Sequence, residues 1–221
     1  MSPSQSSLHP AAILQKSGVE VFFLARHAES ADPTVFHGYE SDIDLGPNGR
    51  AQASRFGARA DLSRVDLLVS SGQLRSLNTL ESLGKTLGLK PRIIRGFHER
   101  KVGILQGTPT NAPNSPFAHT RKEWGNGNKE FTTEGGESYT QVRERVLGAM
   151  HELNDLCIQE HARFPLVVSH GLTMKILLLE WLYGGDTAHW ETIGQIKNTA
   201  LWSLHRPFEV LKDQGCLAHL D

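Results

Sequence analysis

The chain has 221 residues, of which 38% are hydrophobic and 21% charged, as expected for one globular domain with a buried core. Lys and Arg number 23 against 24 Asp and Glu, so no broad basic surface is available for nucleic acid or an anionic membrane. We therefore expect neither as a partner, and any affinity for anions must be local.

The N-terminus and the cysteines indicate the cellular compartment. Residues 1–19 lack the basic start, apolar run and cleavage site of a secretory signal, and they predict a flexible leader. Cys157 and Cys216 are scattered, which favours reduced packing residues over a disulfide framework. The longest apolar segment, 176–182, is too short to span a bilayer. A cytoplasmic protein is expected.

Five short apolar runs have the composition of β-strands, and helical patterns lie between most of them. The first run, 21–25, is continuously apolar, which is typical of a strand covered on both faces. Ser138 and Gln141 form a capping-box pattern that begins a long helix. The predicted strands are 21–25, 66–71, 92–95, 166–169 and 199–204, and the predicted helices are 50–60, 74–87, 138–159 and 171–183.

The alternation of strands and helices implies βαβ crossovers and therefore an α/β protein. We predict a three-layer α/β/α sandwich, a mostly parallel sheet with helices on both faces, in a single domain over residues 20–221. Residues 107–137 interrupt the pattern with three prolines and a glycine pair. A loop of that length is typical of a lid, a binding loop or disorder, and we predict a lid insertion there.

Functional side chains follow the predicted strands where those strands end. In a largely parallel sheet, ligands bind at the carboxyl ends of the strands. Two histidines, two arginines and a carboxylate follow four different strands: Arg26, His27, Arg75, Glu99 and His170. These five side chains are therefore predicted to converge on one edge of the sheet.

This combination of residue types favours phosphoryl transfer. Arginine matches phosphate oxygens and keeps its charge, and a neutral imidazole such as His27 can attack phosphorus to form a covalent intermediate. A second histidine, if protonated, adds positive charge in the transition state. The carboxyl group of Glu99 can protonate the leaving alkoxide and then deprotonate water. Backbone N–H groups at the starts of the following helices add donors for an anion.

The eleven histidines raise the question of a metal site, but their spacing does not favour one. Neither HExxH nor CxxC…H occurs, and arginines in the same pocket would repel a divalent cation. The glycine-rich segments also lack the context of a nucleotide-binding loop. We expect no metal and no cofactor.

The motifs resemble, in order, those of the histidine phosphatase superfamily, which includes the cofactor-dependent phosphoglycerate mutases. Residues 24–30 resemble the LxRHGE[TS] signature, 70–79 resemble SSxLxRAxxTA, and 168–171 match the second histidine motif. Shorter resemblances occur at 44–53, 97–107, 135–138 and 196–199, so the similarity runs from about residue 20 to residue 205.

The resemblance implies the same roles that the strand ends predict. His27 would be the phosphorylated histidine and Glu99 the proton donor, in a phosphatase of the broad-specificity type. The residues expected to bind the phosphate are Arg26, Ser30, Arg75, His170 and Gly171.

Three departures from the family pattern concern the substrate more than the chemistry. Ala28 replaces a glycine beside the nucleophile, Pro33 stands where many members have a phosphate-binding Asn, and Leu105-Gln106 replaces Trp-Glu. At Pro33 one phosphate donor is either lost or supplied differently, by Ser30 or by the segment 37–38.

Three functions fit the sequence, and hydrolysis of a small-molecule phosphate ester is favoured. Mutases of this family carry adjacent arginines in a longer insertion, whereas the cations here are Arg121, Lys122 and Lys129. Mutase-type transfer stays open because Arg100 and Lys101 could bind a second anionic group. The third reading, a catalytically silent protein-binding module, is disfavoured by the complete site. We expect a monomer or a homodimer.

Overall fold

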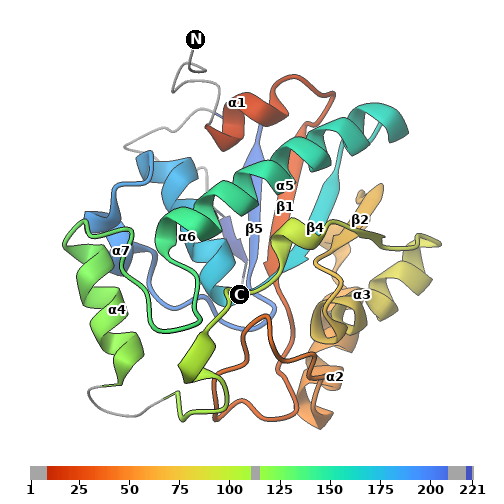
Figure 1. Ribbon diagram of the computed structural model, residues 1–221. Helices are drawn as coiled ribbons and strands as arrows, with labels where there is room; N and C mark the ends of the chain where they lie inside the picture. Colours follow the sequence, from red (N-terminus) through yellow and green to blue (C-terminus); the bar gives the residue numbers. More distant parts are fainter. Residues whose placement is uncertain (1–8, 111–114, 209–217, 221) are drawn as a thin grey trace.

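A six-stranded sheet covered by helices on both faces forms the centre of the computed structural model, which describes residues 9–110, 115–208 and 218–220 (Figure 1). The strand order is β3-β2-β4-β1-β5-β6. Strands β1 to β4 pair in parallel, whereas β5 is antiparallel to β1 and β6 is antiparallel to β5. The strands are β1 Val21–Arg26, β2 Leu67–Ser70, β3 Arg92–Ile93, β4 Pro165–Ser169, β5 Leu201–His205 and β6 Ala218–Leu220.

Seven α-helices occur in the described ranges, together with short 3-10 turns at Ala60–Leu62, Arg95–Phe97, Gly103–Leu105 and Thr187–His189. None of these helices combines the length and the apolar character needed to cross a membrane. The α-helices are α1 Pro10–Leu14, α2 Pro47–Gly57, α3 Leu74–Leu87, α4 Pro116–Gly125, α5 Tyr139–Glu160, α6 Gly171–Tyr183 and α7 Trp190–Ile193.

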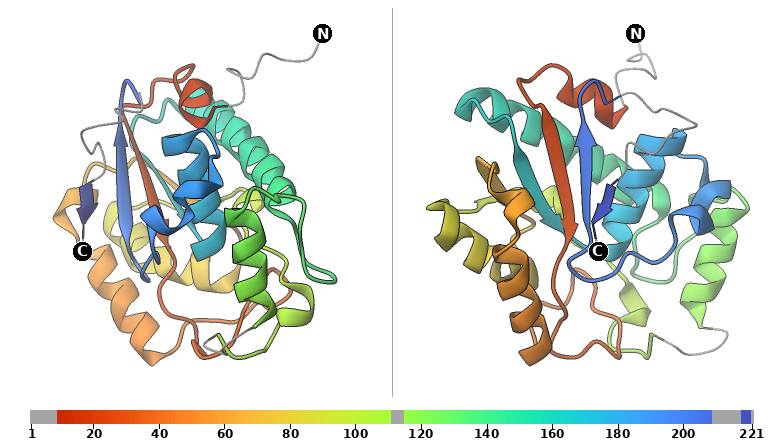
Figure 2. Two further views of the ribbon diagram at one scale, coloured as in Figure 1. Left: turned by 90° about the vertical axis from the view of Figure 1, so that its left-hand side faces the viewer. Right: turned by 180° about the vertical axis from the view of Figure 1, so that it is seen from behind.

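The central strand β1 explains the three layers, because successive side chains of a strand point to opposite faces. Phe22 and Leu24 pack into a core cluster with α1, α5 and α6. Phe23 and Ala25 pack into a second cluster with α2 and α3. Figure 2 shows the sheet between these two helical layers. The predicted three-layer α/β/α fold is confirmed, and the predicted mostly parallel sheet also has an antiparallel edge.

Most predicted elements differ from the observed ones by one to three residues at their ends, and two of these differences have a clear physical reason. The predicted helix 50–60 is α2, which begins three residues earlier because Pro47 suits the first turn, where its missing N–H is not needed. The third strand is only two residues long, since the chain turns into a 3-10 helix at Arg95. This early turn brings Glu99 back toward the end of the sheet.

The prediction of a flexible leader is wrong for residues 9–19. This segment contains α1, whose Ile13 and Leu14 are buried in the core cluster with α5 and α6. The His9 side chain accepts a hydrogen bond from the Ala11 N–H and so caps the helix. The helix is too short to be stable by itself, so tertiary packing decides its conformation. Residues 1–8 of the predicted leader lie outside the described residues.

The predicted lid insertion is not a loop throughout. Ser115 caps helix α4, and Trp124 near the end of that helix is fully buried against Tyr139 and Trp190. The Trp124 indole N–H also donates to the carbonyl of Phe131 at 2.8 Å. These contacts attach α4 to the domain beside α6 and α7 (Figure 1). A lid function for the insertion stays a prediction, and residues 111–114 lie outside the described part.

Candidate active site

A cavity of about 730 Å³ lies where β1, β2 and β4 end, at the lower edge of the sheet in Figure 1. The structure brings all the predicted site residues together there. The ring centroid of His170 lies 5.0 Å from that of His27. The predicted residues that line the cavity are Arg26, His27, Ser30, Arg75, Glu99 and Gly171.

The His27 imidazole is held in the form that a nucleophile requires. Its Nδ1 lies 2.6 Å from the Ala28 carbonyl, and because a carbonyl only accepts hydrogen bonds, Nδ1 carries the proton. The Nε2 atom therefore keeps its lone pair. Burial and the charges of Arg26 and Arg75 hold the pKa of His27 well below its ordinary value, so the ring is neutral. The Asn198 amide also donates to the His27 carbonyl at 2.9 Å.

The two predicted phosphate-binding arginines, of which Arg75 is buried and Arg26 half-buried, are positioned by backbone carbonyls. Arg26 donates through Nη1 to the Ile196 carbonyl at 2.6 Å, and its Nε has no partner among the described residues. Arg75 donates to the carbonyls of Ser41 and Gly38 at 2.8 and 3.2 Å. Burial lowers the pKa of Arg75 to about 10. Neither arginine forms an ion pair within the described ranges, so both charges are available to an anion.

His170 lies at the N-cap of α6 and is completely buried. Its Nε2 is 2.7 Å from the Ser71 hydroxyl, while its Nδ1 has no hydrogen-bond partner in the described part of the chain. Burial, followed by the charge of Arg75, holds the pKa of His170 well below its ordinary value. The histidine is therefore neutral before an anion binds, whereas the sequence analysis considered the protonated form.

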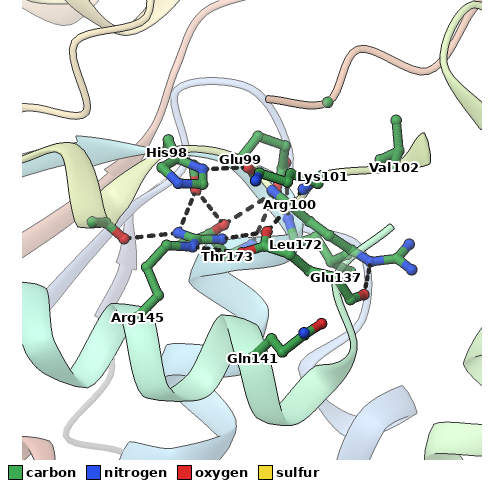
Figure 3. A network of polar contacts seen from close by, with 12 residues as sticks. His98, Glu99, Arg100, Lys101, Val102, Glu137, Gln141, Arg145, Leu172 and Thr173 are labelled. Atoms are coloured by element: carbon green, nitrogen blue, oxygen red, sulfur yellow. Dashed lines mark hydrogen bonds and ion pairs between the residues drawn. The ribbon is translucent and has the colours of Figure 1, made fainter. Parts of the chain in front are cut away.

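The Glu99 carboxylate caps the N-terminus of α6 (Figure 3). Its Oε1 accepts hydrogen bonds from the backbone N–H groups of Arg100 and Thr173 and from the Thr173 hydroxyl, at 2.8 to 3.2 Å. Its Oε2 accepts from the Leu172 N–H at 3.2 Å. Oε2 thus has fewer donors and retains capacity to exchange a proton.

Glu99 is also electrostatically coupled to Arg26 and Arg75, the two arginines predicted to bind phosphate. Burial lowers the pKa of Arg26 and of Arg75, and the negative charge of Glu99 opposes both shifts. One carboxylate therefore lies close enough to act on both cations without pairing with either. This arrangement leaves a positively charged pocket with a proton-exchanging group at its edge.

Arg100 and Lys101 do not occupy the place that the sequence analysis considered for them. Arg100 is fully buried and donates through Nε to the Glu137 carbonyl at 2.7 Å (Figure 3). Its guanidinium also lies over the Trp124 ring. Lys101 is exposed and lies over the Tyr39 ring. Neither side chain lines the cavity, so a second anionic group would need other cations.

The three departures from the family pattern have different surroundings. Ala28 is completely buried. Pro33 lines the cavity, and the nearby Ser30 hydroxyl only makes a long 3.5 Å contact with the Asp32 carbonyl. Gln106 holds the segment around Gly38, because its Oε1 accepts a hydrogen bond from the Gly38 N–H at 3.0 Å. The carbonyl of Gly38 in turn accepts a hydrogen bond from Arg75.

Gln73 is a positioning residue that the sequence analysis missed. Its side-chain amide donates to the carbonyls of Gly38 and Ser41 at 3.2 and 3.3 Å, and its Oε1 accepts the Glu99 N–H at 3.0 Å. Two of these groups also receive hydrogen bonds from Arg75. Gln73 thus connects the segment that holds the arginine to the segment that carries the carboxylate. No local pattern could reveal this role, since its partners are distant in sequence.

We predict that Gln73→Ala lowers the free energy of unfolding by about 1–3 kcal/mol, because three hydrogen bonds to buried or partly buried backbone groups are lost and the Glu99 N–H loses its acceptor. The matched change Gln159→Ala, on the exposed face of α5, should alter it by less than about 0.5 kcal/mol. Urea unfolding followed by circular dichroism measures both. Equal stability of the two variants would show that Gln73 does not hold these segments.

No group of three or more His, Cys, Asp or Glu side chains within residues 9–110, 115–208 and 218–220 is arranged to hold a metal ion.

Known proteins resemble this chain over most of its length. The curated relative "Probable phosphoglycerate mutase GpmB" of Yersinia pestis is 28% identical over 190 residues, which cover 82% of this chain and 86% of the relative. A mycobacterial glucosyl-3-phosphoglycerate phosphatase aligns with a TM-score of 0.68 at 25% identity, over 84% of this chain and 90% of that one. The α-ribazole phosphatase of Shigella flexneri shares the fold, with a TM-score of 0.67 at 19% identity over 83% and 89% of the two chains.

A family model described as histidine phosphatase superfamily, branch 1, matches residues 22–208. That span contains all seven predicted site residues and, apart from Val21 at the start of β1, the strands β1 to β5. The chain belongs to the histidine phosphatase superfamily.

Proposed function

We propose that the chain is a phosphomonoester hydrolase that acts through a covalent phosphohistidine on His27. The observation that carries this proposal is the neutral, buried His27 ring, whose Nε2 lone pair lies beside two arginines that have no ion-pair partner in the described residues. The cavity beside it has room for a small-molecule phosphate ester. Two of the similar solved structures are named as phosphatases, which is consistent with this activity.

In the first step, the Nε2 lone pair of His27 attacks phosphorus and the bond between phosphorus and the ester oxygen breaks. Arg26 and Arg75 bind the phosphoryl oxygens, and their positive charge stabilises the transition state. Glu99, in its protonated form, transfers its proton from Oε2 to the departing oxygen. The product leaves as an alcohol, and a phosphohistidine remains on the enzyme.

In the second step, the Glu99 carboxylate takes a proton from water as the water oxygen attacks phosphorus. The bond between phosphorus and Nε2 breaks, which returns neutral His27 and releases inorganic phosphate. His170 would gain a proton when the dianionic phosphoryl group is bound beside it, because the added negative charge favours the imidazolium. The chain's own residues therefore supply the nucleophile, the acid and the phosphate ligands.

Mutase-type transfer is the second candidate, and the relative named as a phosphoglycerate mutase favours it. It would share the first step and differ in the acceptor, because the phosphoryl group would pass to a second hydroxyl group instead of water. The two activities therefore differ in their products and not in the nucleophile.

The purified protein is expected to hydrolyse p-nitrophenyl phosphate in the presence of EDTA and to be inhibited by vanadate. Quenching a reaction of the ³²P-labelled ester with alkaline detergent should trap a phosphoenzyme that is stable in base and lost in acid, as a phosphohistidine is. Release of inorganic phosphate in equal amount to nitrophenol supports the hydrolase, and a deficit that appears as phosphorylated alcohol supports transfer. Absence of both turnover and phosphoenzyme with every ester would support a non-catalytic binding module.

A further inference from the structure

The cavity extends beyond the phosphate-binding groups to a second wall built by α4, α6, α7 and the loop that carries Phe36. This wall combines aromatic rings with two cations that the catalytic steps do not use. Its residues, which we call the distal wall, are Phe36, Phe117, Arg121, Lys175, Trp190 and Glu191.

Lys175 is the central group of the distal wall. The residue is only 8% exposed, yet it lines the cavity. Its Nζ donates to the Gly194 carbonyl at 2.9 Å and lies 4.4 Å from the centre of the Trp190 ring. An ammonium group has three donors, and in the described chain no ion pair is formed by this one. A buried cation with unused donors lowers its free energy when an anion binds to it.

Arg121 adds a second positive charge to the same wall. It projects from α4, lies over the Phe117 ring and is close enough for its charge to lower the pKa of Lys175, after the larger effect of burial. The charge of Glu191 raises the pKa of Lys175, but within the described residues Glu191 forms an ion pair with neither Lys175 nor Arg121. The distal wall therefore has two positive charges and one exposed negative charge, and this net positive charge attracts an anion.

The distal wall is separate from the place where the phosphoryl group would bind. Lys175 lies four residues after Gly171 in α6, or about 6 Å along the helix axis, and a Cβ added at Gly171 would lie 3.4 Å from the Arg26 guanidinium. A ligand whose phosphate lies at Arg26 can therefore meet Lys175 with a second anionic group. The rings of Phe36 and Phe117, whose centroids are 5.1 Å apart, offer an apolar surface for the part between.

We propose, on the basis of the phosphatase function above, that the substrate is a phosphomonoester whose leaving group carries its own anionic group, which Lys175 and Arg121 bind. The group that the distal wall would bind is a second carboxylate or phosphate of the substrate. This group would lie about 5 Å, the length of one helical turn, from the reacting phosphate, with an apolar part of the substrate between them. Discrimination would arise because a neutral leaving group leaves the Lys175 donors unpaired in a buried place.

The test compares two esters of nearly equal shape, 4-carboxyphenyl phosphate and its neutral analogue 4-carbamoylphenyl phosphate, together with their 3-substituted isomers. We expect a higher kcat/KM for the charged member of at least one pair. Lys175→Met should lower this preference by about 10- to 100-fold, the value of a hydrogen bond to a charged group. Arg121→Gln should lower it by about two- to fivefold, since Arg121 is exposed.

Two controls separate recognition from structure. Lys175→Arg should retain the preference, and Lys122→Gln, beside Arg121 on α4 but outside the cavity, should keep the wild-type preference. Thermal unfolding of each variant reports whether it is folded. An unchanged preference in folded Lys175→Met and Arg121→Gln would overturn the proposal.

The pH dependence provides a further readout. The pKa of Lys175 is lowered to about 8, chiefly by burial, with Glu191 and Arg121 as the charged groups that act on it. The ammonium form exists below this pKa, so the preference should be present below pH 8 and decline above it. In Lys175→Arg the decline should disappear, because a guanidinium stays charged.

The two proposals can fail separately. If neither ester is hydrolysed and no phosphoenzyme forms, the phosphatase function fails. The distal wall is then tested by calorimetric binding of the same esters to the unreactive protein. Equal affinity for the charged and neutral esters would overturn it, and tighter binding of the charged ester that Lys175→Met removes would support it.

Discussion

His27→Asn is expected to lower kcat for p-nitrophenyl phosphate by about 10⁴-fold or more, as removal of a covalent nucleophile does in other enzymes. Asparagine can place an amide N–H where His27 Nδ1 now donates to the Ala28 carbonyl, so the local hydrogen bond can persist. It has no atom equivalent to the Nε2 lone pair. The loss should therefore come from chemistry and not from misfolding.

Three measurements make the result decisive. Thermal unfolding should give a similar Tm for the wild type and His27→Asn, and quenching with alkaline detergent should trap a phosphoenzyme from the wild type but none from the variant. His151→Asn, which alters an exposed histidine of α5, serves as the matched control and should keep wild-type activity. A phosphoenzyme or near-normal turnover in His27→Asn would assign the nucleophile to another residue.

Glu99→Gln is expected to have an effect that depends on the leaving group. For an alkyl phosphate, whose alkoxide needs a proton to depart, kcat/KM should fall by about 10²- to 10⁴-fold. For p-nitrophenyl phosphate it should change much less, because nitrophenolate leaves without protonation. The amide keeps an oxygen that can accept the Arg100 and Thr173 N–H groups, so the site geometry can persist.

The second step should show the loss of the base even with the good leaving group. Water must be deprotonated to clear the phosphohistidine, so the variant should release a burst of nitrophenol and then turn over slowly. Rapid-quench kinetics should show the phosphoenzyme accumulating. Glu134→Gln, at an exposed carboxylate of the insertion, is the control for the charge change. Equal losses for alkyl and nitrophenyl esters, without a burst, would exclude Glu99 as the acid.

Local sequence determined the parts of the fold that depend on nearby residues. The sequence correctly predicts β1 and β4 from their apolar runs and the start of α5 from the capping box at Ser138. These features are predictable because an apolar run and a helix cap depend on residues that are close in sequence. The boundaries that were wrong, such as the end of β3 and the start of α2, depend on where the chain turns against its neighbours.

The convergence of the site followed from the same local information. Strand ends of a parallel sheet meet at one edge, so the residues after β1, β2 and β4 had to come together once the strands were assigned. The roles of His27 and Glu99 were predicted on this basis and await the experiments above.

Other features were decided by tertiary structure alone. Helix α1 forms because the core covers it, and Arg100 is buried over the Trp124 ring although its position in the sequence suggests a pocket residue. Gln73 and Lys175 acquire their roles from partners on distant segments. The physical reason is the same in each case: sequence spacing determines which side chains leave a strand or helix together, whereas burial and long-range hydrogen bonds depend on how those elements pack.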